Sequence, residues 1–273
     1  ALISDPMMPS KAANGDLDDI RACVACNQAC IGHMLNACSI SCIQRPETGR
    51  ELQYANISKT KLKKNILVAG GGPAGVKAAC IAADRGHRVT LCEKSNSLGG
   101  QINLAQSLPG RAEFGGIITN LNKELTKTTV SVRFNSFVDL DLIEELAPDV
   151  VIAATGATPY MPEIQGAEEA HVVNAWQVLE GKANVGGRVV IADWRCDWVG
   201  LGLAELLVKQ GCHIRLAVNG MVAGQNIPQY ARDAWIGKLH KLGVEIIPHV
   251  RVCLLYTSDA ADEGLGVDLG GRR

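Results

Sequence analysis

The stretch that decides the fold is NILVAGGGPAG, residues 65–75. Its apolar start predicts a buried β-strand, and the small residues that follow the glycines predict a helix packed closely on a sheet. The glycines fit the pattern G-x-G-x-x-G, in which Gly70 permits a tight turn and Gly72 lets the backbone approach a pyrophosphate. Gly75 would let the helix pack against the strand, and the N–H groups at its N-terminus favour phosphate. The stretch therefore predicts a dinucleotide-binding turn.

The surroundings of this turn strengthen the prediction. Glu93 ends the next predicted strand, where a carboxylate can accept a hydrogen bond from a ribose hydroxyl. Two later stretches, Gly99–Gln101 and Thr155–Gly156, are further places where backbone could approach a flavin nucleotide. A glycine turn that binds no ligand is the alternative, and the strand before the turn, the helix after it and Glu93 together argue against it.

The remainder of the chain repeats the alternation of strands and helices. Helices are predicted over Ala74–Arg85 and Leu201–Gln210, with strands before, between and after them. The predicted strands are Ile66–Ala69, Arg88–Cys92, Asp149–Ala154, Gly187–Ala192, Ile214–Val218 and Val244–Ile247. This order predicts an α/β fold with parallel sheets covered on both faces.

Five of the ten cysteines lie within residues 21–50. Four of them, Cys23, Cys26, Cys30 and Cys42, are spaced Cys-x2-Cys-x3-Cys-x11-Cys. Four thiolates satisfy a [4Fe-4S] cluster, and this asymmetric spacing favours a cluster over a four-cysteine zinc site, which more often has two Cys-x2-Cys pairs. Cys38 could replace a ligand or be a small buried side chain. Cys80, Cys92, Cys196 and Cys212 are predicted to fill the cores.

Composition excludes several classes of function. Lysine plus arginine is 27 and aspartate plus glutamate is 28, so the net charge of −1 offers no basic excess for nucleic acid. No apolar run approaches the roughly 20 residues of a membrane helix. Clustered cysteines without a secretory segment favour a reducing, cytoplasmic location. The start at Ala1 instead of methionine favours a fragment.

In their order along the chain, these motifs resemble the C-terminal half of the 2,4-dienoyl-CoA reductase/trimethylamine dehydrogenase family. The resemblance covers about residues 1–252 and also includes Cys26–Gln28 and Gly49–Glu51. Members are flavoproteins with an old-yellow-enzyme-like TIM barrel that carries FMN, a [4Fe-4S] cluster and a two-part, Rossmann-like nucleotide-binding region. The resemblance implies that the FMN barrel is missing here, so no catalytic residue is predicted.

The resemblance also carries site residues onto this chain. It implies cluster ligands at Cys23, Cys26, Cys30 and Cys42, and FAD or ADP contacts at Ala74, Glu93, Gln101, Arg111 and Val138. Together with the glycine motifs, the candidate cofactor-binding residues are Gly70, Gly72, Pro73, Ala74, Gly75, Glu93, Gly100, Gln101, Arg111, Val138, Thr155 and Gly156.

Five segments are expected from these motifs. They are the end of the missing barrel (1–20), a cluster segment (21–58), an FAD- or ADP-binding domain (59–185), a degenerate second unit of NAD(P) type (186–252) and a tail resembling a cloning scar (253–273). The second unit is degenerate because DWRCDWVG, residues 193–200, replaces its glycine-rich turn. The negative charges of its two aspartates would repel a pyrophosphate, and the bulk of its two tryptophans would block close approach.

The degenerate turn resembles the amine-dehydrogenase branch of the family. The leading expectation is therefore oxidative N-demethylation of a small methylated amine, with electrons passed through the cluster to an electron-transferring flavoprotein. An NADPH-dependent 2,4-dienoyl-CoA or enoate reductase is the alternative, and a non-catalytic electron-transfer or nucleotide-binding module is the second alternative. A homo-oligomer is expected as well.

Overall fold

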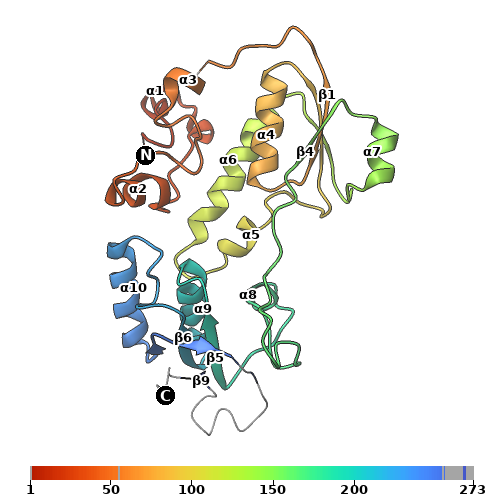
Figure 1. Cartoon of the computed structure of the whole chain (residues 1–273). Helices are drawn as coiled ribbons and strands as arrows, with labels where there is room; N and C mark the ends of the chain where they lie inside the picture. The colour runs from red at the N-terminus through yellow and green to blue at the C-terminus, as the bar shows by residue number, and fades with distance from the viewer. Residues whose placement is uncertain (1, 55, 254, 256–266, 269–273) are drawn as a thin grey trace. The chain divides into compact units, whose positions relative to one another are not determined.

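The computed structural model describes residues 2–54, 56–253, 255 and 267–268. It divides into two compact units, Ala1–Ala157 and Thr158–Arg273 (Figure 1). Residues 1–58, which the sequence assigns to two segments, fall within the first unit. The predicted non-native tail, residues 253–273, lies mostly outside the described residues.

The first unit is built on a parallel sheet with the strand order β3-β2-β1-β4. Its strands are β1 (Asn65–Ala69), β2 (Arg88–Cys92), β3 (Ser131–Arg133) and β4 (Val150–Ala153). β1 pairs with both β2 and β4, so the apolar strand that opens the glycine motif lies inside the sheet. Four of its five residues are buried, as the sequence predicts.

Helices cover both sides of this sheet (Figure 1). α4 (Pro73–Asp84) and α6 (Gly115–Thr126) lie on one side, and α7 (Leu140–Leu146) lies on the other. Ile117 and Leu121 of α6 pack into the same core as Val76 of α4. Two short elements precede α6, namely α5 (Ile102–Ala105) and the 3-10 turn η3 (Ala112–Phe114).

The N-terminal part of this unit consists of short helical turns. They are α1 (Met8–Asn14), the 3-10 turn η1 (Leu17–Asp19), the π-helical turn η2 (Gln28–Gly32), α2 (His33–Leu35) and α3 (Glu51–Tyr54). Val24 and Cys26 are buried in the core formed with α4 and α6. The cysteine-containing segment therefore shares the core that covers the first sheet.

The second unit has a parallel sheet with the strand order β5-β6-β7. Its elements are α8 (Ala175–Leu179), β5 (Arg188–Asp193), α9 (Trp198–Lys209), β6 (His213–Val218), α10 (Gln229–Lys241), β7 (Glu245–Ile247) and an antiparallel pair, β8 (Arg251–Val252) with β9 (Val267–Asp268). Val178 and Leu179 of α8 pack against the core of this unit. The connecting segment before residue 186 thus packs with the second sheet.

A buried carboxylate joins α9 to α10. Glu205 accepts hydrogen bonds from Lys209 Nζ at 2.6 Å and from Trp235 Nε1 at 2.8 Å, and it pairs with Lys238 Nζ at 2.5 Å. Burial opposes the ionisation of Glu205, but these partners outweigh it and lower its pKa. Because both Trp235 and Lys238 belong to α10, this cluster holds a largely polar helix on the sheet.

The predicted α/β fold with parallel sheets is confirmed. β2 has the predicted bounds, and the predicted fillers Cys80, Cys92, Cys196 and Cys212 are all buried. Cys38 is exposed, so its interpretation as a buried side chain is wrong. No helix among the described residues is both long enough and apolar enough for a membrane span.

Candidate functional site

The glycine turn between β1 and α4 is closed by backbone packing. Gly70 has a φ of +112°, which favours glycine, and a Cβ there would overlap the carbonyl oxygen of Ala154, the residue after β4. A Cβ on Gly75 would overlap the carbonyl oxygen of Gly70. Both glycines are therefore required by the fold itself, with or without a ligand.

Gly72 differs from these two glycines. A Cβ built on it meets no atom of the described chain within 4 Å. Gly72 is also the N-cap of α4, and no side chain in the described residues caps this helix end. Pro73 occupies the first turn, where the missing N–H costs nothing. The space next to Gly72 is therefore open, and the helix end has uncapped N–H groups of the kind that bind a pyrophosphate.

Glu93 stands beside the turn and is held by three hydrogen bonds. Its Oε2 accepts from the N–H of Gly71 at 2.6 Å, and its Oε1 accepts from the N–H and the Oγ of Ser95, both at 2.8 Å. Burial opposes ionisation, but these bonds outweigh it and lower the pKa of Glu93. A carboxylate has about four acceptor positions, so one remains for a ribose hydroxyl.

Two further predicted stretches converge on the turn. A Cβ on Gly100 would lie 3.4 Å from the Cα of Gly72, and Gln101 Nε2 donates to the carbonyl of Ala157 at 3.2 Å. A Cβ on Gly156 would lie 3.3 Å from the same Gln101 nitrogen. The backbone at residues 99–101 and 155–157 therefore lines one edge of the turn.

The structure places the remaining predicted contacts around this edge. Ala74 and Thr155 are exposed, and Val138 is half-buried in the loop that follows β3. That loop is anchored next to Glu93, because the N–H of Ser136 donates to the Glu93 carbonyl at 2.9 Å. Arg111 is half-buried and belongs to a different neighbourhood, with its guanidinium over the ring of Phe114. Ser95 was not predicted, and its place two residues after Glu93 was the only signal for it.

The four cysteines named as ligands differ in their exposure. Cys26 is buried, Cys30 and Cys42 are half-buried and Cys23 is exposed. The N–H of Ser41 donates to the carbonyl of Ala29 at 2.7 Å, which brings the chain next to Cys42 against the chain next to Cys30.

The electrostatics of Cys26 test whether these residues fit a cluster. Burial raises the pKa of the Cys26 thiol, the N–H of Gln28 lowers it, and the charges of Cys30, Cys42 and Cys23 raise it. By their chemistry, four thiols are the donor set that a [4Fe-4S] cluster requires. Within the part of the chain that the structure describes, no three histidine, cysteine or acidic side chains are grouped as a metal site.

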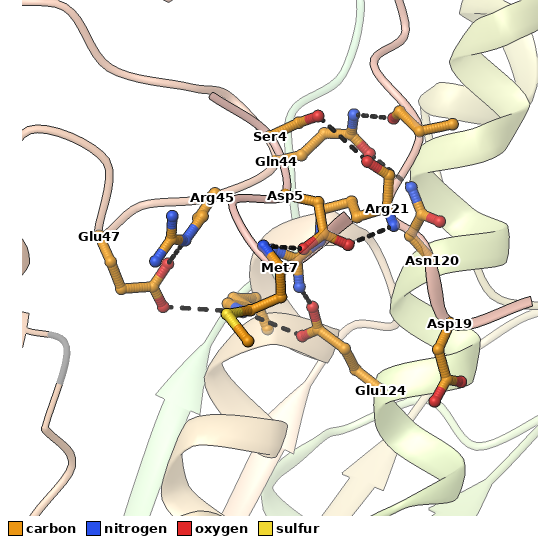
Figure 2. A network of polar contacts seen from close by, with 12 residues as sticks. Ser4, Asp5, Met7, Asp19, Arg21, Gln44, Arg45, Glu47, Asn120 and Glu124 are labelled. Carbon is orange, nitrogen blue, oxygen red and sulfur yellow. Dashed lines mark hydrogen bonds and ion pairs between the residues drawn. The ribbon is translucent and has the colours of Figure 1, made fainter. Parts of the chain in front are cut away.

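A charged network fastens the cysteine segment to α4 and α6 (Figure 2). Arg21 pairs with Glu124 of α6, and Lys77 of α4 lies 2.9 Å from Glu124 Oε2 and 3.9 Å from Glu47 Oε1. Burial lowers the pKa of Lys77, and the charge of Glu47 raises it. Because these groups pair across segments far apart in the sequence, the network joins the cysteine segment to α4 and α6. Sequence reasoning missed it, since each residue alone looks like surface charge.

A cavity of about 680 Å³ lies along α4 and α6 beside this network. Its walls are mainly apolar and include Ile81, Ile117, Leu121 and Ile152. An apolar wall does not suit the charged phosphates of a dinucleotide. The turn at Gly72, with its open N–H groups, therefore remains the candidate nucleotide site of the first unit.

The corresponding turn of the second unit is filled by its own carboxylates. Asp197 is the N-cap of α9 and accepts a hydrogen bond from the N–H of Val199 at 2.9 Å. Asp193 is buried, and its Oδ1 accepts from the N–H of Cys196 at 2.9 Å. A Cβ on Gly200 would come within 2.5 Å of the Asp193 carboxylate. The end of α9 is therefore occupied where a pyrophosphate would bind.

Asp193 is electrostatically unusual. Its Oδ2 is buried and has no hydrogen-bond partner among the described residues. Burial and the charge of Asp197 raise its pKa to about 6, against the opposing hydrogen bond from Cys196. The prediction that two tryptophans block this turn is half wrong. Trp194 is exposed beside the turn, but Trp198 packs toward the core, with its ring centroid 6.0 Å from that of Trp235.

Comparison with known proteins identifies a family of oxidoreductases to which this chain is similar. Residues 64–260 match the family model described as pyridine nucleotide-disulphide oxidoreductase. An NADH oxidase of Thermoanaerobacter brockii is 39% identical over 218 residues, which are 79% of this chain and 34% of that protein. An N,N-dimethylglycine/sarcosine dehydrogenase of Chromohalobacter salexigens is 33% identical over 249 residues, 86% of this chain and 36% of that protein.

The same likeness extends to a solved structure. A complex of 2-naphthoyl-CoA reductase with 2-naphthoyl-CoA superposes with a TM-score of 0.86 at 30% identity. That match covers 93% of this chain and 38% of the other. The chain thus spans about a third of the length of the curated relatives it matches.

Proposed function

Because the chain belongs to the pyridine nucleotide-disulphide oxidoreductase family, whose members are flavin-dependent oxidoreductases, we propose that it carries the FAD and cluster sites of an amine dehydrogenase. The proposed reaction is oxidative N-demethylation of a small methylated amine, with electrons passed through a [4Fe-4S] cluster to an electron-transferring flavoprotein. FMN and the substrate are assigned to a TIM barrel, which the family resemblance implies and the greater length of the relatives accommodates.

The observation that carries this choice is the turn before α9. A pyridine nucleotide needs free N–H groups and no negative charge at such a turn. Here Asp197 caps the helix, and Asp193 lies against Gly200. Bringing like charges together in a partly dry site costs several kcal/mol of binding free energy. The second unit is therefore expected to bind NAD(P)H poorly.

The residues of the chain have distinct parts in this proposal. The N–H groups beyond Gly72 bind the pyrophosphate of FAD, Glu93 accepts from its ribose, and Cys23, Cys26, Cys30 and Cys42 hold the cluster. When bound, the flavin and the cluster supply the redox chemistry. The charged network around Lys77 and Glu124 keeps the two sites in a fixed relation.

Location and assembly belong to the same proposal. All ten cysteines, each within the described residues, are free thiols, which supports a reducing cytoplasmic location. A homo-oligomer is proposed from the family resemblance alone.

An NAD(P)H-dependent reductase is the second candidate. It is favoured by the names of two similar proteins, an NADH oxidase and a 2-naphthoyl-CoA reductase. A module that only transfers electrons or binds nucleotide is a third candidate, and it would respond to neither kind of reductant.

The deciding experiment mixes the intact gene product anaerobically with N,N-dimethylglycine, or with NADH or NADPH, and follows the flavin absorbance. Bleaching by the amine and none by micromolar pyridine nucleotide is expected. Rapid bleaching by NADH or NADPH would instead support the reductase, and no bleaching by any of the three would leave the electron-transfer module.

A further inference from the structure

The cysteine segment contains little regular structure. Its longest helical element among the described residues is η2, with five residues. Three of its residues that carry a Cβ, Ala25, Asn27 and Ala37, have φ values between +50° and +55°. This left-handed conformation is uncommon for residues other than glycine. Local backbone preferences therefore do not hold this shape, and contacts between parts of the chain must do so.

A side-chain hydrogen bond joins the two ends of the cysteine segment. Gln44 follows Cys42 by two residues, and its Nε2 donates to the carbonyl of Ala22 at 2.8 Å. Ala22 immediately precedes Cys23. The bond therefore connects the chain beside the first of the four named ligands to the chain beside the last.

The other end of the Gln44 amide is anchored to α6 (Figure 2). Its Oε1 accepts a hydrogen bond from Asn120 Nδ2 at 2.8 Å. The Gln44 side chain is buried, with 8% of the residue exposed, so water does not readily replace either partner. One buried amide thus links both ends of the segment and attaches them to the helix that covers the first sheet.

A backbone hydrogen bond holds the chain on the other side of Cys42. The N–H of Ser41 donates to the carbonyl of Ala29, beside Cys30, at 2.7 Å. The chain at Cys42 is therefore held toward the neighbour of Cys30 by one bond and toward the neighbour of Cys23 by the other. Only the second bond depends on a side chain, so a substitution can remove it selectively.

We propose that Gln44 is a positioning residue for the [4Fe-4S] cluster, which holds the chain at Cys23 and Cys42 in place before the cluster binds. The inference rests on the proposed function, since it requires the cluster. A preformed site loses less conformational entropy on binding than a site that must first be ordered. The Gln44 bonds should therefore limit local opening of the ligand segment and slow the loss of the cluster.

The first test measures local opening in the full-length protein after removal of iron. Mass spectrometry follows the alkylation of each cysteine in the wild type and in Gln44→Leu, which keeps a similar size but removes both hydrogen bonds. The half-buried Cys30 and Cys42 should be alkylated about tenfold faster, as expected when a buried hydrogen bond is lost from an opening equilibrium. Cys80 and Cys92, buried in the first unit, should keep their wild-type rates.

The second test measures the stability of the cluster itself. Iron should pass from anaerobically purified Gln44→Leu to a ferrous chelator about tenfold faster than from the wild type, since the same opening releases the cluster. Gln53→Leu is the matched control, because it makes the same substitution at an exposed glutamine of α3. It should change neither the alkylation rates nor the rate of iron transfer.

The outcomes separate this role from the proposed function. Wild-type protein without the spectrum of a [4Fe-4S] cluster would overturn the cluster and this role of Gln44 together. A normal wild-type cluster with unchanged rates in Gln44→Leu would overturn the role of Gln44 alone. Equal acceleration at Cys80 and Cys92 would do the same, because it indicates global unfolding.

A second variant covers the case in which Gln44→Leu does not fold. Gln44→Glu keeps an acceptor for Asn120 and removes the donor to Ala22. Faster transfer of iron from this variant than from the wild type supports the proposal, and an unchanged rate overturns it.

Discussion

The two units place the same kind of turn between a first strand and a first helix, and they complete it in opposite ways. In the first unit the helix cap is Gly72, and the third residue after it is Gly75. In the second the cap is Asp197, and the third residue after it is Gly200. Both third positions need glycine, but Gly75 makes room for a backbone carbonyl and Gly200 makes room for the Asp193 side chain.

This comparison shows that a retained glycine does not by itself indicate a retained ligand site. What distinguishes the two turns is the cap. Gly72 leaves the helix N–H groups open, whereas Asp197 satisfies one of them and adds a negative charge. The anion site that a helix dipole creates is thus available in one unit and neutralised by the chain itself in the other.

The largest effect is expected from closing the first turn. Gly75→Val would force a branched side chain into the carbonyl oxygen of Gly70, which is backbone and cannot rotate away. We expect the first unit to lose about 3 kcal/mol or more of its free energy of unfolding. Urea unfolding measures this loss, and a variant as stable as the wild type would show that the turn can open.

A smaller effect is expected from neutralising the second turn. The pKa of Asp193 is raised from 3.8 to about 6 in the folded chain, so the protonated form is favoured by folding. The protonated Asp193 therefore contributes fully to the free energy of unfolding below pH 3.8, and this contribution is lost as the pH rises through about 6. Asparagine does not ionise, so Asp193→Asn should not lose this stability as the pH rises. Above pH 6 the free energy of unfolding of the variant should exceed that of the wild type by on the order of 2 kcal/mol.

Thermal unfolding of both proteins between pH 4 and pH 8 measures that difference. Asp233→Asn, at an exposed aspartate of α10, controls for the loss of one charge. A gap between Asp193→Asn and the wild type that stays constant over this range would contradict a buried, destabilising carboxylate.

The smallest effect on stability, and the most specific one on binding, is expected at Gly72. Gly72→Val meets no neighbour in the described chain and keeps an extended backbone, so its stability should change by less than about 1 kcal/mol. The valine side chain would occupy the space that the pyrophosphate needs. We expect the affinity for ADP to fall about tenfold, which corresponds to a loss of about 1.4 kcal/mol of binding free energy. Calorimetric titration with ADP checks this, and unchanged affinity would move the nucleotide site away from the turn.

Much of the fold could be predicted because the signals are local. β1 and β2 are short apolar runs next to glycines, and the alternation of strand and helix indicates parallel sheets. α6 was not predicted, although Ile117 and Leu121 at a spacing of four residues carried a usable signal. α10 offered almost none, since Leu239 is its one buried residue in the described structure. That helix depends on contacts with Glu205, which belongs to another helix.

By itself the sequence determined the α/β class, the position of the glycine turn, and Glu93 as its acidic partner, because strand periodicity, glycine and motif spacing act over a few neighbouring residues. Only the tertiary structure decided which glycine faces open space, which aspartate is buried, and which lysine pairs with Glu124. Gly70 is constrained by Ala154, and Lys77 pairs with Glu124, so each property depends on a distant segment. Packing brings such segments together, and no local pattern records which of them will meet.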